Sequence, residues 1–307
     1  MARVVFIGTE EFSLAMLEET VRLGAEVVAS FSLTREWAAA FPEWRDFGDV
    51  AALLGVEHHA VGSIRAPEVL GRLKELRPDA LLVMGIPQLL TPEMIASARL
   101  GAIATHPSLL PRNRGLHAIP WHLLRDEPEG GLSVFPIGAG MDDGPILDRR
   151  RFRIALTDDA RKLYDRVTAA GREMLPGVLG MIDRGRIDAE PQEERLATYL
   201  PKRLPDRRID WMCNARRIYD LVRALTDPYG GAFGWLGNRR MTVWEAGFSH
   251  EPIVARPGEI VKMTERGVEV ATGAGLIVLR RVQVGEAIQP ALDVFERERI
   301  HVGAVLP

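Results

Sequence analysis

The sequence contains a single cysteine, Cys213, among its 307 residues. One cysteine excludes a disulfide framework within the chain and a cysteine-rich metal site, and it is typical of proteins of the reducing cytoplasm. No apolar run approaches the roughly 18–20 residues that a membrane helix needs. The first residues also lack the pattern of a secretory signal. We therefore expect a cytoplasmic protein with no membrane partner and no metal site.

An excess of basic charge is also absent. The formal net charge is −3 at pH 7, so a general attraction to nucleic acid or anionic lipid is not expected. The 47% hydrophobic and 26% charged residues are ordinary for a globular protein with a substantial core. The length suits two domains. We expect a first domain over residues 1–187, a polar linker with prolines over 188–206, and a second domain over 207–307.

Hydrophobic periodicity indicates alternating strands and helices in the first domain. Apolar runs at 4–7, 26–31, 56–61 and 80–84 predict buried strands, and helical spacing predicts helices over 12–23 and 67–76. This alternation favours the α/β class with a Rossmann-like, mostly parallel sheet. The turn from Gly8 to Phe12 holds one glycine, so the three-glycine dinucleotide fingerprint is absent.

The second half of the chain changes character. Residues 145–154 predict another strand and residues 157–182 a long amphipathic helix, which is followed by the linker and a helix over 215–225. Gly237-Asn238 is a strong hairpin signal between strands at 232–236 and 239–246. Short strands are expected at 259–263, 267–272 and 276–284. We therefore predict a small, β-rich, OB-like C-terminal domain.

The central stretch over residues 102–115 runs through apolar residues to His106 and then enters a loop with two prolines and a closing glycine. The carboxyl ends of strands in a parallel sheet face the crevice where ligands bind. His106 is therefore a candidate for chemistry, and the alternative is a histidine that merely bonds to a neighbouring loop. About thirty-five residues later, the glycine-rich turn 138–144 presents Asp142 between two apolar segments.

These two stretches, His106 to Gly115 and Met141 to Leu147, resemble the signature of the folate-dependent formyltransferase family. The turn from Gly8 to Phe12 is similar to the opening of the methionyl-tRNA formyltransferases, and residues 207–233 resemble formyltransferases that act on sugar nucleotides. The family usually carries an asparagine two residues before the histidine, where this chain has Ala104. The resemblance implies a formyltransferase catalytic domain with 10-formyltetrahydrofolate as the formyl donor.

The resemblance also implies roles for individual residues. His106 would donate to the developing oxyanion or shuttle a proton, and Asp142 would orient the histidine or help to accept the proton of the attacking amine. Ala104 cannot replace the missing donor, for which Thr105, His117 or a backbone N–H are candidates. The expected folate-binding residues are Met84, Gly85, Ile86, Leu89, Leu90, Ile137, Gly138, Ala139, Gly140 and Asp142. The expected acceptor-binding residues are Thr9, Ser108, Leu109, Leu110, Arg114, Gly115 and His117.

Three functions compete at this point: formyl transfer to a small-molecule amine such as an amino sugar nucleotide or amino acid derivative, methionyl-tRNA formylation, and an impaired folate binder or hydrolase. Residues 201–307 hold 16 Lys+Arg and 13 Asp+Glu, a small excess for a tRNA-binding module. We therefore expect a small-molecule acceptor, with tRNA as an alternative partner and a homodimer left open.

The region 34–48, where tRNA formyltransferases carry a basic loop, has acidic residues that offset Arg35 and Arg45. A phosphate-binding role is therefore not expected there. Its aromatic residues either pack on their own domain or form a lid or a wall for the acceptor. These aromatic residues are Trp37, Phe41, Trp44 and Phe47.

Overall fold

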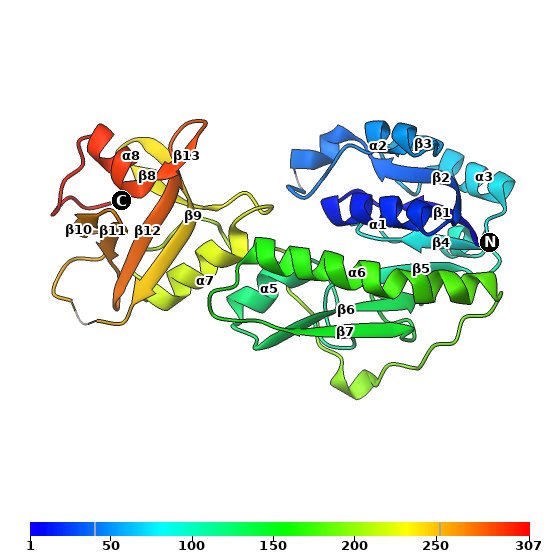
Figure 1. Cartoon of the computed structure of the whole chain (residues 1–307). Coiled ribbons are helices and arrows are strands. Elements are labelled where there is room, and N and C mark those ends of the chain that lie inside the picture. Colours follow the sequence, from blue (N-terminus) through cyan, green and yellow to red (C-terminus); the bar gives the residue numbers. More distant parts are fainter. Residues whose placement is uncertain (40, 252) are drawn as a thin grey trace. The chain divides into compact units, whose positions relative to one another are not determined.

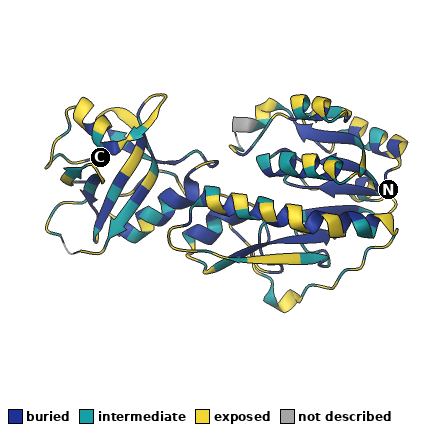
Figure 2. Ribbon diagram, viewed as in Figure 1, coloured by how far each residue is buried: buried dark blue, intermediate teal, exposed yellow. Residues whose placement is uncertain are grey.

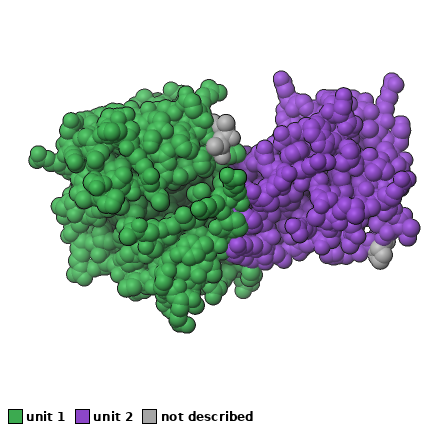
Figure 3. Space-filling model, turned by 180° about the vertical axis from the view of Figure 1, so that it is seen from behind, with its two compact units in different colours: residues 1–118, 128–154, 163–203 green, residues 119–127, 155–162, 204–307 purple. Residues whose placement is uncertain are grey.

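The computed structural model describes residues 1–39, 41–251 and 253–307 (Figure 1). The chain forms two compact units, which are coloured separately in Figure 3. The first unit holds residues 1–118, 128–154 and 163–203, and the second holds 119–127, 155–162 and 204–307. Short segments of the middle of the chain therefore group with the C-terminal unit. The sequence-based domain limits stay a prediction.

The first unit is built on a seven-stranded sheet in the order β3-β2-β1-β4-β5-β6-β7. Neighbouring strands from β3 to β5 run parallel, whereas β6 pairs antiparallel with both β5 and β7. The predicted mostly parallel α/β sheet is confirmed. The strands are β1 (Arg3–Ile7), β2 (Glu26–Leu33), β3 (His58–Val61), β4 (Ala80–Val83), β5 (Ala102–His106), β6 (Glu129–Pro136) and β7 (Asp148–Arg153).

Helices cover the sheet because their apolar faces need burial. Val69, Leu73 and Leu76 of α3 join an apolar cluster with strand residues such as Val5 and Phe31. On α1 the backbone N–H of Phe12 donates to the Tyr164 hydroxyl of α6 at 2.8 Å. The helices of this unit are α1 (Glu11–Arg22), α2 (Gly48–Leu53), α3 (Pro67–Leu76), α4 (Pro92–Ile95) and α6 (Ala160–Asp183, whose first three residues belong to the second unit), with 3₁₀ turns η1 (Arg35–Ala39) and η2 (Glu194–Leu196).

Two predicted boundaries differ from the structure for local reasons. Helix α6 begins at Ala160 rather than near Thr157, because Asp159 accepts a hydrogen bond from the Lys162 N–H at 2.9 Å and caps the first turn. Strand β7 begins at Asp148 rather than Pro145. Ile146 instead forms an isolated antiparallel bridge with Glu190, within the predicted linker.

The second unit is dominated by an antiparallel sheet in the order β10-β11-β12-β9-β8, with β13 paired to β12. The predicted hairpin over Gly237-Asn238 is present, with Leu236 opposite Arg239. The strands are β8 (Ala232–Leu236), β9 (Arg239–Ser249), β10 (Ile260–Thr264), β11 (Gly267–Ala271), β12 (Leu276–Gln283) and β13 (Ile288–Pro290). The predicted β-rich C-terminal domain is confirmed.

Helices α5 (Ala118–Leu124), α7 (Ala215–Leu225) and α8 (Ala291–Arg297) complete the chain. Strand β13 and α8 were not predicted, since three mostly exposed residues and seven helical residues give little periodic signal. Buried residues concentrate in the strands of each sheet, as the dark segments of Figure 2 show. Among the described residues, no helix combines the length and apolar character that crossing a membrane requires.

Candidate active site

His106 is the last residue of β5, where its side chain is almost completely buried. Its Nε2 lies 2.7 Å from the backbone oxygen of Asn113. A carbonyl oxygen can only accept, so Nε2 carries the proton and donates to it. In the neutral ring this leaves Nδ1 with a free lone pair, which lies 3.7 Å from Oδ2 of Asp142. The structure therefore brings the two predicted proton-handling residues together and directs Nδ1 at the carboxylate.

Asp142 is held in position by its own backbone and by two segments distant in sequence. Its φ of +50° is left-handed, a conformation that aspartate tolerates better than most residues. Oδ2 accepts a hydrogen bond from the Gly115 N–H at 2.8 Å. The backbone oxygen of Asp142 accepts from Nε2 of Gln192 at 2.8 Å, and the same Nε2 donates to Gly144 O at 2.7 Å. Gln192 was missed by sequence analysis, because one glutamine in a polar segment gives no pattern.

Hydrogen bonds of two serines hold the loop from Pro107 to Gly115 in place beside the sheet. The Ser108 hydroxyl donates to Arg112 O at 2.7 Å, and the Ser133 hydroxyl donates to Ser108 O at 2.7 Å. Ser133 Oγ also accepts from the Leu110 N–H at 3.1 Å. Ser108 and Leu110, both predicted to bind the acceptor, have no exposed surface. These interactions hold the Asn113 carbonyl in place for His106.

Arg114, another predicted acceptor residue, is 1% exposed and bonded on several sides. Its guanidinium forms two hydrogen bonds with the Glu194 carboxylate, at 2.8 and 2.9 Å. It also donates to Gln192 Oε1 at 2.9 Å and to the Tyr199 hydroxyl at 3.0 Å. This pairing holds the pKa of Glu194 below its ordinary value. In this conformation the side chain of Arg114 connects the catalytic loop to residues 192–199.

Ala104 lies two residues before His106, so both side chains project from the same face of β5. It is 8% exposed and belongs to the apolar cluster that includes Leu90 and Phe135. An asparagine at this position would place its polar amide among apolar side chains, on the face of β5 that also carries His106. The structure therefore explains why an alanine packs well here, and it assigns no replacement donor.

The predicted folate segments lie at the ends of β4 and β6. Gly85 has a φ of +75°, and the following residues range from buried Leu90 to Leu89, which is 54% exposed. At the other segment, the Asp143 carboxylate accepts from the Gly140 N–H at 2.8 Å. A Cβ on Gly138 would collide with that carboxylate. Oδ1 of Asp143 is buried without a hydrogen-bond partner among the described residues.

These features suit a flat heterocycle that is bound by backbone groups. Glycines keep the turn narrow, and buried Met84 and half-buried Ile86 and Ile137 supply apolar surface close to exposed backbone. The unpartnered oxygen of Asp143 offers an additional acceptor for a ligand N–H. The residues present therefore fit the formyl donor that the sequence predicts.

In the chain, Thr9 precedes both expected folate segments and His117 lies between them. Thr9 is fully buried, and its hydroxyl oxygen accepts from the Leu33 N–H at 3.3 Å. His117 has a left-handed φ of +61°, and burial lowers its pKa, which favours the neutral ring. Its ring stacks with Phe41 at a centroid distance of 6.5 Å. His117 is therefore the more accessible of these two predicted acceptor residues.

The aromatic residues of region 34–48 mostly pack on the first unit. The indole N–H of Trp37 donates to Gly62 O at 3.0 Å, and that of Trp44 donates to Leu33 O at 2.8 Å. Phe47 is fully buried and stacks with His58. Phe41 alone among them contacts a predicted acceptor residue, namely His117. The packing interpretation therefore describes three of the four rings, and the wall interpretation fits Phe41.

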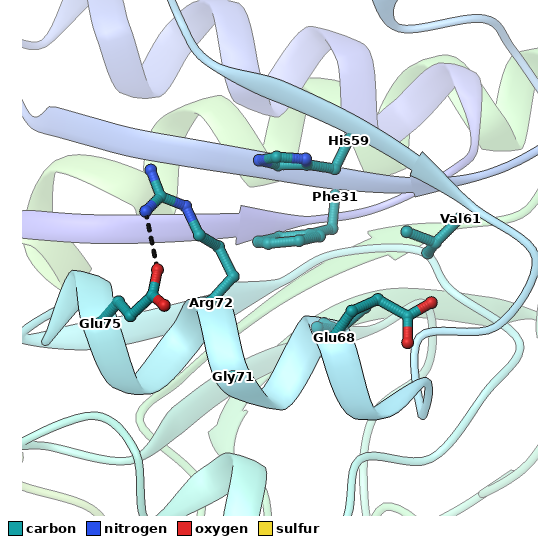
Figure 4. Close-up of a pocket in the computed structure, with 8 residues that line it drawn as sticks. Phe31, His59, Val61, Glu68, Gly71, Arg72 and Glu75 are labelled. Atoms are coloured by element: carbon teal, nitrogen blue, oxygen red, sulfur yellow. Dashed lines mark hydrogen bonds and ion pairs between the residues drawn. The ribbon is translucent and has the colours of Figure 1, made fainter.

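A separate pocket of about 440 Å³ lies between α3 and the strands β2 and β3 (Figure 4). Its lining includes the stacked rings of Phe31 and His59, at a centroid distance of 4.9 Å. Arg72 lines it as well, already paired with Glu57 and Glu75 at 2.7 and 3.0 Å. None of its lining residues belongs to the predicted site. This pocket is therefore distinct from the His106–Asp142 arrangement.

Comparison with known proteins gives the same family for both halves of the chain. Residues 2–179 match the Formyl transferase family model, and residues 203–299 match the model named Formyl transferase, C-terminal domain. A methionyl-tRNA formyltransferase of Citrifermentans bemidjiense is 30% identical, with 99% of this chain and 96% of that protein covered. The enzyme of the same name from Acetivibrio thermocellus is 31% identical, covering 92% and 91%.

Solved structures share the fold at lower identity. HypX from Aquifex aeolicus, in complex with tetrahydrofolic acid, has a TM-score of 0.70 at 18% identity, covering 98% of this chain and 48% of that one. The sugar 3N-formyl transferase WlaRD, solved with dTDP and 5-N-formyl-THF, has a TM-score of 0.67 at 15% identity, covering 94% and 99%. The chain belongs to the formyl transferase family and is a folate-dependent formyltransferase whose donor is a formyltetrahydrofolate.

Proposed function

We propose that this chain transfers the formyl group of 10-formyltetrahydrofolate to a primary amine, with His106 and Asp142 moving the proton. The observation that carries the proposal is the arrangement of the His106 ring. Its Nε2 is tied to Asn113 O at 2.7 Å, and its Nδ1 faces Asp142 at 3.7 Å. A fixed tautomer with one free lone pair is what a general base in amine chemistry requires.

The attacking amine must lose a proton as its new bond to the formyl carbon forms. The bond from the formyl carbon to the folate nitrogen breaks as the new bond forms, and the Nδ1 lone pair of His106 would accept the proton of the amine. The ring would then carry a positive charge until it returns the proton to the leaving folate nitrogen. Asp142 stabilises this charge from 3.7 Å, because Gly115 and Gln192 hold the aspartate in place. The expected donor site, between residues 84–90 and 137–142, supplies apolar surface and backbone groups for the folate.

The relatives favour methionyl-tRNA as the acceptor. Two methionyl-tRNA formyltransferases align with nearly the whole chain, including the C-terminal domain, at 30–31% identity. On this ground methionyl-tRNA is the first acceptor to test, ahead of the small molecule that the sequence predicts.

A small-molecule amine is the second candidate, and the charge distribution favours it. Residues 201–307 carry a net charge of only +3, which is weak for a surface that binds a polyanion. In the region 34–48, Arg45 is paired with Glu11 at 2.6 Å and so does not present a free charge to phosphate. A homodimer and a cytoplasmic location stay predictions.

One experiment separates these acceptors. The purified chain is incubated with 10-formyltetrahydrofolate and methionyl-tRNA, with an amino sugar nucleotide, or with no acceptor, and formylated product and free formate are measured. Formylation of either amine that is lost in a His106→Asn variant supports the proposal. Formate release without acceptor, at a rate that neither amine changes, identifies a hydrolase and contradicts it.

A further inference from the structure

Two carboxylates lie together where β1 leads into α1. Glu10 directly precedes α1, and Glu43 belongs to the segment that follows η1. The backbone connects them: the Glu11 N–H donates to Glu43 O at 3.1 Å, and Glu10 forms an isolated antiparallel bridge with Trp44. The two acidic side chains therefore come from two neighbouring backbone segments and lie in one small region.

The surroundings of this pair stabilise charged carboxylates poorly, so each carboxyl favours its protonated form until a cation binds. Glu43 is 5% exposed, and its Oε2 has no hydrogen-bond partner among the described residues. Burial and the Glu43 charge raise the pKa of Glu10 to about 8, and burial raises the pKa of Glu43 to about 7. The adjacent arginine, Arg45, is committed elsewhere: it bonds Glu11 at 2.6 Å and the carbonyl of Trp44 at 2.9 Å.

The pair lies at the sheet edge that also carries His106. Strands β1, β4 and β5 are parallel neighbours, so Glu10, Gly85 and His106 all follow or end strands at the same edge. A Cβ on Gly85 would lie 3.0 Å from Oε2 of Glu10, which places this carboxylate against the turn after β4. Two strand spacings separate β1 from β5, about 10 Å in all.

The expected folate site includes Gly85, which the Glu10 carboxylate approaches, so the pair borders that site on its β1 side, where an acceptor could lie. The segment with Glu43 also reaches this region, because Phe41 stacks on His117 just beyond the catalytic loop. Aromatic rings beside carboxylates suit organic cations, which gain from both cation–π and charge-assisted hydrogen bonds. A phosphate at this turn would instead meet two carboxylates.

We infer that Glu10 and Glu43 bind a cationic group of the acceptor, an ammonium or amidinium, about 10 Å from the amine that is formylated. The inference rests on the proposed function and adds the substrate class: a small amine that carries a second basic group. The unpartnered Oε2 of Glu43 is the acceptor that this cation satisfies. This favours the second acceptor candidate over methionyl-tRNA.

The test uses two amines of equal length, 1,8-diaminooctane and octylamine, of which only the first has a second ammonium. Calorimetry measures their affinity for the full chain with 5-formyltetrahydrofolate present. We expect the diamine to bind about tenfold or more tightly, as a hydrogen bond to a charged group predicts. The Glu10→Gln/Glu43→Gln variant and the single Glu43→Gln variant should lose this preference. A Glu68→Gln variant, which changes an acidic residue in the first turn of α3, should keep it.

Equal affinities in the unmodified chain overturn the inference, as does a preference that survives in both glutamine variants. The heat of 5-formyltetrahydrofolate binding shows that each variant is folded. Formyl transfer to the diamine is measured in parallel. A diamine preference without transfer supports the cation site and counts against the proposed function, whereas transfer without a preference does the reverse.

Discussion

At the scale of single residues, the chemistry of the site depends on which polar atoms already have hydrogen-bond partners. Nε2 of His106 is used by Asn113 O, so chemistry is left to Nδ1. The guanidinium of Arg114 is used by Glu194, Gln192 and Tyr199, so this predicted acceptor residue acts as part of the loop's support. Hydrogen-bond satisfaction therefore divides the motif residues into those that we propose to react and those that hold them in place.

Removing either member of the proton-handling pair should slow transfer without weakening folate binding. We expect His106→Asn and Asp142→Asn each to reduce kcat by about 10²-fold or more, with the affinity for 5-formyltetrahydrofolate nearly unchanged. Steady-state kinetics and calorimetry measure the two quantities. His301→Asn, at an exposed histidine of the second unit, serves as the control. If both pair variants retain full activity, these residues do not carry the chemistry.

Restoring the family asparagine tests how the site has adapted to alanine. Ala104 is 8% exposed within an apolar cluster, so Ala104→Asn should lower the free energy of unfolding by about 1–3 kcal/mol. We expect the activity to stay level or fall, because the added amide crowds the histidine face of β5. Denaturant unfolding and initial rates give the two readouts. A rise in activity of about tenfold or more would mean that the missing donor limits the enzyme.

The raised pKa of Glu10 predicts a pH-dependent stability. The folded state holds its proton up to about pH 8, whereas an unfolded glutamate releases it near its ordinary value of 4.5. The contribution is therefore complete below about pH 4.5 and is lost as the pH rises toward 8. The groups that face Glu10 are Glu43, Tyr164 and, through Glu43, Arg45. Glu10→Gln should remove this loss.

The measurement is a series of thermal melts from pH 5 to pH 8.5. At the upper end Glu10→Gln should be more stable than the unmodified chain by about 1–3 kcal/mol, and the difference should shrink toward pH 5. Parallel melting curves for the two proteins across the whole range would show that Glu10 titrates normally.

At the scale of elements, a segment predicted to be a linker supports the catalytic turn. Residues 190–199 bridge to Ile146, bond Asp142 through Gln192 and meet Arg114 at Tyr199. His106 ends β5 and Asp142 lies in the turn after β6, and this segment holds the two loops that follow these strands. Its side chains bond the backbone of Asp142 and Gly144 and the guanidinium of Arg114, so its contribution lies in the positions of these two loops.

Loss of this support should reduce turnover more than binding. We expect Gln192→Ala to lower kcat by about tenfold, because Asp142 would lose one of the hydrogen bonds that hold it near Nδ1. The KM for the folate donor should change less. Glu193→Ala is the matched control, since it alters the adjacent exposed residue, whose carboxylate pairs with Arg195. Equal kinetics for the two variants would contradict the supporting role.

At the scale of the whole molecule, the family assignment covers both halves of the chain. The distribution of charge, however, does not favour tRNA as the acceptor. The first 200 residues carry a net −6, and residues 201–307 carry +3. Binding to a polyanion releases counterions in proportion to the phosphates neutralised, so a small basic excess predicts weak binding and a shallow salt dependence.

A gel shift with total tRNA tests this directly. At physiological salt we expect a dissociation constant in the micromolar range or weaker, which is typical of non-specific contact. Methionyl-tRNA is run alongside, and a strongly basic tRNA-binding protein gives the positive reference. Tight binding that falls steeply as salt rises would contradict the charge argument and place methionyl-tRNA ahead as the acceptor.

Local sequence patterns predicted the architecture and the pair that we propose to react. The apolar run at 4–7 predicted β1, helical spacing predicted α1, and the Gly237-Asn238 turn signal predicted the hairpin. The motif around His106 and the turn around Asp142 were visible because each is a contiguous run of unusual residues. Their approach to 3.7 Å depends on the course of the turn after β6, because β6 runs antiparallel to β5 and ends beside Ile103 rather than beside His106.

Only the tertiary structure decided which polar groups are free. Gln192, Glu194 and Tyr199 lie about 80 residues after the loop that they support, and no spacing rule connects them. Glu10 and Glu43 are likewise ordinary acidic residues in sequence, and burial of Glu43 beside Glu10 makes them a candidate site. Periodicity reports which face of an element is buried, whereas hydrogen-bond partners and shifted pKa values depend on side chains from distant segments meeting in space.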